Sequence, residues 1–227
     1  MNQSRALRRA GWAGAASVVL LAAGVGLTAP VSVDAPSASD AAILASINDG
    51  TKQALAGIGL PLLGLGVALL LWFAVGLRQV LDRLSGGDSL AHAIVPAAAL
   101  LGGLTIAGVA ISVSSAVAAL SNKFTADADT ARAFGAAGLA VGLTGLAGGA
   151  AVVAVTTRLA QQAHALPTWL VWVSYAVALL CLTSFWSAGV ASVALGLWLI
   201  GAVVAVLRAA NASLGADGDP GAVGEAT

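Results

Sequence analysis

The 227 residues of this chain are 59% hydrophobic and only 9% charged, whereas an ordinary soluble domain carries about 25% charged residues. Ten basic and ten acidic residues cancel to a formal net charge of zero, so bulk charge gives no reason to expect nucleic acid or an acidic substrate as a partner. Cys181, the single cysteine, excludes a disulfide or a cysteine-based zinc site within one chain. This composition indicates an integral membrane protein.

Long uncharged intervals in the sequence fit membrane crossings. Covering about 30 Å of hydrocarbon takes roughly 20 apolar residues in a helix, and lipid cannot satisfy the free backbone groups of other structures. Four intervals fit one crossing each, and residues 159–207 fit a hairpin of two. We predict an all-α bundle within residues 11–208, with six transmembrane helices at approximately 12–29, 55–77, 94–120, 134–155, 167–184 and 190–207.

The first predicted helix follows a short basic tail, residues 1–10, and resembles a signal peptide in this respect. Its apolar stretch of about 18 residues exceeds the 7–15 usual for a signal peptide. Cleavage near Ala29 or Ala35 is unfavourable because a proline follows each of them. We favour a retained first helix, and cleavage, which would leave five spans, is the alternative.

The first outer loop, residues 30–54, contains the pattern of a short amphipathic helix. A helix start at Ser37 or Ser39 precedes three apolar residues, and a stop follows at 48–50; the apolar residues are Ile43, Leu44 and Ile47. We expect this helix to lie on the outer surface, with its apolar side against headgroups or the bundle. A tether between spans is the preferred interpretation, and ligand binding is the alternative.

Stripes of small residues mark the third and fourth spans. Five glycines recur at spacings of three and four, which places them on one helix face: Gly135, Gly138, Gly142, Gly145 and Gly149. The third span carries a matching stripe of Thr105, Gly108, Ser112, Ser115 and Ala119. Because small residues let membrane helices approach closely, we predict a tight antiparallel pair, with a homodimer as the alternative. A leucine at Gly142 is expected to disrupt folding.

The second outer loop, residues 121–133, carries two acidic residues whose position has a structural explanation. Asp127 and Asp129 precede the fourth span, where acidic residues stabilise the positive end of a helix. They are too few for a metal site.

Residues 209–227 are rich in small and polar residues, and we predict a disordered cytoplasmic tail.

The distribution of Lys and Arg predicts the orientation, because cytoplasmic loops carry an excess of basic residues. With both termini cytoplasmic, the inner segments hold Arg5, Arg8, Arg9, Arg78, Arg83, Arg158 and Arg208. The outer segments hold Lys52, Lys123 and Arg132. Most tryptophans then lie at a membrane boundary, with Trp12, Trp72, Trp169 and Trp172 at the inner one and Trp186 at the outer one. Trp198 lies mid-span and does not fit this pattern.

No residue pattern predicts an enzyme. The six predicted spans contain no Asp, Glu, Lys or Arg, which argues against a proton relay or a voltage sensor. His92 and His164 lie at inner boundaries, where a lone histidine is usually a hydrated neighbour of headgroups. Cys181 is interpreted as a packing residue. We predict no catalytic residue, no cofactor and no metal site.

Three segments resemble a broad family of uncharacterised six-helix membrane proteins of high-GC Gram-positive bacteria. They are Asn48-Asp49-Gly50 at the end of the long first outer loop, Asp129-Thr130-Ala131-Arg132-Ala133, and Leu166-Pro167-Thr168-Trp169-Leu170. The resemblance spans roughly residues 12–208 and implies the same fold and a membrane location. It implies no activity and no site residues.

These observations favour a non-enzymatic structural or accessory protein of the cytoplasmic membrane that acts through helix–helix or lipid contacts. Its expected partners are membrane lipids and another membrane protein or a second copy. The alternative is a transporter or channel for a small neutral or lipophilic compound, with Thr105, Ser112 and Ser115 lining the path.

Overall fold

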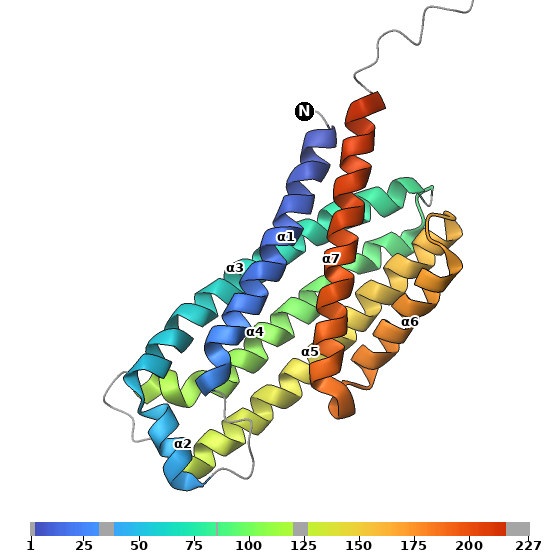
Figure 1. Ribbon diagram of the computed structural model, residues 1–227. Helices are drawn as coiled ribbons and strands as arrows, with labels where there is room; N and C mark the ends of the chain where they lie inside the picture. Colours follow the sequence, from blue (N-terminus) through green and yellow to red (C-terminus); the bar gives the residue numbers. More distant parts are fainter. Residues whose placement is uncertain (1–2, 32–38, 85, 120–126, 217–227) are drawn as a thin grey trace, which may run out of the picture.

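The computed structural model describes residues 3–31, 39–84, 86–119 and 127–216, and nearly all of these residues are helical (Figure 1). These residues form no strand. The long helices are α1 (Gln3–Thr28), α3 (Gly50–Leu84), α4 (Ile94–Ala119), α5 (Ala128–Gln162) and α7 (Ser184–Ala216). The shorter elements are α2 (Asp40–Ile47), α6 (Thr168–Leu182) and the 3-10 turns η1 (Ala29–Val31) and η2 (Ser89–Ala93).

Six helices pack side by side, and each runs opposite to the next one along the chain (Figure 1). They are α1, α3, α4, α5, α6 and α7. Helix α1 lies against α3 and α7, α4 lies between α3 and α5, and α6 contacts α5 and α7. The first turns of α1 and the last turns of α7 meet, since a Cβ added at Gly11 would touch Leu207. The start of α1 and the end of α7 therefore lie at the same end of the bundle.

Five helices in the described part of the chain are long and apolar enough to cross a membrane, namely 5–28, 50–84, 89–119, 128–162 and 188–208. The chain is therefore a multi-pass membrane protein. The fifth predicted span is confirmed only as a shorter apolar helix, because α6 has 15 residues and extends about 22 Å at 1.5 Å per residue. Thr183 ends α6, and the small residues expected to separate two spans begin α7 instead.

The helices extend beyond the predicted apolar segments. α3 and α5 have 35 residues each and measure about 52 Å, which exceeds the roughly 30 Å thickness of the hydrocarbon. α1 begins within the predicted amino-terminal tail, and α7 continues into the predicted disordered tail as far as Ala216. Residues 217–227 of that tail lie outside the described residues.

The carboxyl-terminal ends of α3 and α5 follow the same hydrogen-bonding pattern. At the end of α3, Gly87 N donates to Asp82 O at 2.9 Å, and Gly86 has a φ of 70°. At the end of α5, Ala165 N donates to Ala160 O at 2.9 Å, and His164 has a φ of 52°. A left-handed residue in this position closes a helix by satisfying its last carbonyls. His164 therefore terminates α5.

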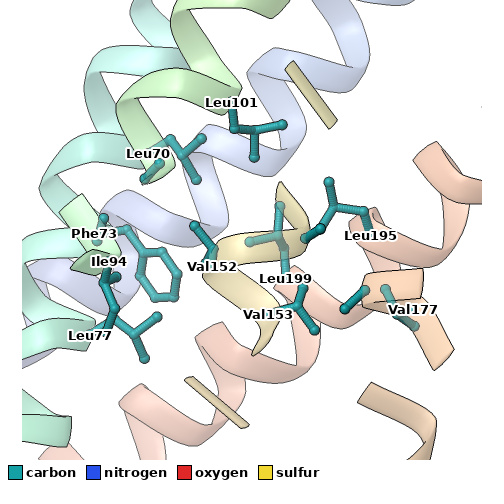
Figure 2. Packing of buried hydrophobic residues seen from close by; sticks show 14 of the residues in the cluster. Leu70, Phe73, Leu77, Ile94, Leu101, Val152, Val153, Val177, Leu195 and Leu199 are labelled. Atoms are coloured by element: carbon teal, nitrogen blue, oxygen red, sulfur yellow. The ribbon is translucent and has the colours of Figure 1, made fainter. Parts of the chain in front are cut away.

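A continuous hydrophobic core joins α3 to α7 (Figure 2). Phe73 and Leu77 of α3 meet Ile94 of α4 on one side, and Val153 of α5 meets Leu199 of α7 on the other. Cys181 of α6 is buried in the same core. The outward faces are also apolar, and four exposed tryptophans lie towards the end of the bundle where the chain starts: Trp12, Trp72, Trp169 and Trp172. The side chain of Trp186 lies outside the described residues.

Trp198 is accounted for by a contact between α6 and α7. Its Nε1 donates a hydrogen bond of 3.1 Å to Oγ of Ser174, and Ser174 is only 2% exposed. An indole N–H that is buried in an apolar environment needs such a partner. The tryptophan that does not fit the boundary pattern therefore links two helices within the bundle.

Replacing Trp198 by Phe should lower the free energy of unfolding by about 1 kcal/mol, because polar contacts between membrane helices contribute about 0.6 to 1.7 kcal/mol. The measurement is unfolding in mixed detergent micelles. The control is Trp172→Phe, at a position that is 71% exposed, and it should leave stability nearly unchanged. Equal losses in both variants would contradict the proposed role of this hydrogen bond.

Candidate functional site

Helix α2 packs against α3, α4 and α5 at the end of the bundle opposite the start of α1. It forms where the sequence predicts an amphipathic helix. Ser39 caps its start by accepting a hydrogen bond from Ala42 N at 3.3 Å, and Asn48 N donates to Leu44 O at its end. Ile43 and Ile47 are buried against residues of α3, α4 and α5, namely Ala56, Val113, Ala116, Ala128 and Ala131. The apolar side of α2 therefore faces the bundle. Ser37, the other predicted start, lies outside the described residues.

Polar contacts hold α2 at both of its ends. Arg132 of α5 pairs with Asp40 in the first turn of α2 and with Asp129 at 2.9 Å. At the other end, Gln53 Nε2 donates to Ile47 O at 2.7 Å, and Lys52 Nζ lies 3.0 Å from Ser46 Oγ. Hydrogen bonding to Asp40, and then to Asp129, raises the pKa of Arg132 above its ordinary value. Arg132 therefore bridges the start of α2 to the start of α5.

Asp127 caps α5. Its carboxylate accepts hydrogen bonds of 3.0 Å from the backbone N–H and the hydroxyl of Thr130. These two bonds, the backbone one first, lower the pKa of Asp127. The acidic residues of this loop thus serve helix ends and an ion pair, and no group of three His, Cys, Asp or Glu side chains within the described ranges is close enough to hold a metal ion. Lys123 lies outside the described residues.

Helices α4 and α5 approach each other backbone to backbone. A Cβ added at Gly108 would lie 2.6 Å from Gly138 O and 2.7 Å from Gly142 N. A Cβ at Gly138 would overlap Gly108 O and Ser112 Oγ. Only glycine permits this separation, because any side chain would push the two helices apart.

The predicted stripe on α5 does not serve a single neighbour. Gly138 and Gly145 face α4, whereas Gly149 faces Leu195 of α7. Gly148 is not part of the predicted stripe, yet it contacts Leu101 and Ala97 of α4. A Cβ at Gly142 would meet open space, so the expectation that a leucine there disrupts folding is corrected. Gly135 is buried. The spacing of the glycines places them on a face of α5, but it does not predict which neighbouring helix each glycine contacts.

The hydroxyls of the α4 stripe lie within the helix contact. Thr105 Oγ1 donates to Leu101 O of its own helix at 2.7 Å, and Ser112 Oγ lies where a Cβ at Gly138 would be. Ser115 is buried, and its hydroxyl has no hydrogen-bond partner among the described residues.

A second glycine interface joins α1 and α3, and our sequence analysis missed it. A Cβ at Gly24 would lie 2.6 Å from Leu63 Cγ, and one at Gly59 would lie 2.8 Å from Thr28 Cγ2. Gly66 approaches Leu21, and Gly76 approaches Ala10. The available signal was the spacing of seven between Gly59 and Gly66, which places both on one face.

An apolar groove of about 360 Å³ lies along one face of α7. It is open to the surroundings of the helix bundle and is lined by Gly189, Val190, Val193, Ala194 and Leu197. The groove therefore suits lipid tails or another apolar helix better than a polar solute.

Gly138→Ala should destabilise the protein by about 1 to 3 kcal/mol, as overpacking does, because the added methyl group overlaps backbone atoms of α4. Gly142→Ala is the matched control and should be neutral or slightly stabilising, since alanine favours helices. Thermal unfolding in detergent compares the two. A Gly138→Ala variant as stable as the wild type would contradict the close approach.

Arg132→Gln should release the start of α2, because it removes the charge that holds Asp40. Hydrogen–deuterium exchange of residues 40–47 should become faster, while exchange in α6 stays the same. Arg158→Gln, at an exposed position at the other end of α5, is the control. Unchanged exchange in α2 would show that Ile43 and Ile47 suffice to hold it.

No family model, curated protein or solved structure matches the chain.

Proposed function

We propose that the protein resides in the cytoplasmic membrane with both termini in the cytoplasm. The arrangement of the helices supports this orientation, because the start of α1 and the ends of α3, α5 and α7 lie at one end of the bundle (Figure 1). These segments carry Arg5, Arg8, Arg9, Arg78, Arg83, Arg158 and Arg208. Lys52 and Arg132 lie at the other end, where both are engaged with α2. Basic residues remain on the cytoplasmic side during insertion. The packing of α1 against α3 and α7 likewise supports a retained first helix.

Its proposed role is that of a non-enzymatic structural or accessory component, acting through lateral contacts with another membrane protein or with lipid. The observation that carries this proposal is the groove on α7, because small residues on an outward face allow a second helix to approach closely. Gly189 lines it, and a Cβ there would meet nothing within 4 Å. The proposed resemblance to uncharacterised six-helix proteins is compatible with this role.

Transport of a small compound has less support. Transport needs a polar or hydrated route through the bundle, whereas the core that joins α3 to α7 is apolar. The hydroxyl of Thr105 donates to Leu101 O of its own helix, and the hydroxyl of Ser112 lies against Gly138 of α5. Both hydroxyls thus have a role in packing.

Photocrosslinking in native membranes tests the accessory role. A photoreactive residue at Val193, which is 65% exposed in the groove, should give a discrete protein adduct. The same residue at Val19, which is equally exposed on α1, should give lipid adducts. Ala194→Leu would narrow the groove and should reduce the protein adduct at Val193. Lipid adducts alone at both positions, together with solute flux in proteoliposomes, would favour the transporter.

A further inference from the structure

The first turns of α1 present a charged stripe. Arg5, Arg8, Arg9 and Trp12 follow the spacing i, i+3, i+4, i+7, which places them on one face of the helix, and all four are exposed. The opposite face holds Leu7 and Ala10, which are buried. The arginines are therefore held outward by the packing of the helix behind them.

Arg208 of α7 adds a fourth cation at the level of this stripe. A Cβ at Gly11 of α1 would lie 2.5 Å from Leu207 Cδ2, so Arg208, the next residue and exposed, lies at the level of the second and third turns of α1. We call Arg5, Arg8, Arg9 and Arg208 the α1–α7 arginine cluster. It combines residues from two helices that are far apart in the sequence.

Among the described residues, the cluster has no acidic partner. Within the described ranges, no ion pair joins any of its four arginines to a carboxylate. Of the two acidic residues described at this end, Asp82 pairs with Arg78 at 3.4 Å, and Asp88 accepts a hydrogen bond from Leu90 N. Unpaired guanidinium groups bind phosphate in a bidentate manner.

The depth of the cluster identifies the partner. Trp12 is exposed on the same face as the arginines, and Val19 continues that face one heptad further into the apolar segment. At 1.5 Å per residue, Arg9 lies about 4.5 Å and Arg5 about 10.5 Å beyond Trp12 along the axis. Tryptophan rings occupy the boundary between hydrocarbon and headgroups. The arginines therefore lie at the level of lipid phosphates, directly above a surface that faces acyl chains.

We infer that the α1–α7 arginine cluster binds the phosphate groups of anionic phospholipids in the adjoining leaflet. A soluble acidic partner would need neither the continuous apolar face below the cluster nor the exposed ring of Trp12. The inference rests on the proposed membrane function and specifies its lipid contact.

The test uses the purified full chain in detergent, so that membrane orientation does not enter the measurement. Native mass spectrometry compares the retention of phosphatidylglycerol with that of phosphatidylcholine. Arg8→Gln/Arg9→Gln should reduce the preference for phosphatidylglycerol by about 30-fold. The matched control, Arg83→Gln/Arg158→Gln, removes two exposed arginines from the same end and should change it less than threefold.

A loss confined to the first pair of substitutions supports the cluster. An unchanged preference in that variant, or an equal loss in the control, would overturn it. Displacement of phosphatidylglycerol by inorganic phosphate at millimolar concentration would overturn the lipid as the ligand. The photocrosslinking experiment at Val193 reports on the lateral protein contact independently, so failure of one proposal is distinguishable from failure of the other.

Discussion

Lipid provides no hydrophobic drive for helices to associate, so close approach between backbones is the interaction on which the rest of this structure depends. Gly108 and Gly138 bring α4 and α5 together, and Gly24 and Gly59 do the same for α1 and α3. α3 and α4 also pack against each other. These contacts join α1, α3, α4 and α5, and α2, α6 and α7 pack against these four helices.

The two ends of the bundle use charge differently. At the end that carries α2, Arg132 pairs with Asp40 and Asp129, and Asp127 caps α5. These charges are satisfied within the protein, and the pair between Arg132 and Asp40 holds the start of α2. At the other end, Arg5, Arg8 and Arg9 are exposed. Exposed guanidinium groups are available for the surroundings of the protein, and we infer that these surroundings are phospholipid headgroups.

Between the ends, polar side chains serve the packing of helices. Ser174 accepts from Trp198 across two helices, and Thr105 and Thr157 donate to carbonyls of their own helices. Such bonds satisfy hydroxyls where no water is present. This use of polar groups leaves the outward faces, including the groove on α7, as the surfaces through which we propose that the protein acts.

The sequence by itself determined the helical class, most of the apolar segments and the position of α2, because lipid permits few backbone structures and because Ser39 and Asn48 are local helix signals. Only the tertiary structure decided which neighbour each glycine faces, why Trp198 lies mid-span, and that Arg208 joins Arg5, Arg8 and Arg9. The physical reason is the same in each case. Helical periodicity is a local property that places a residue on a face, whereas the partner of that face depends on how distant helices pack.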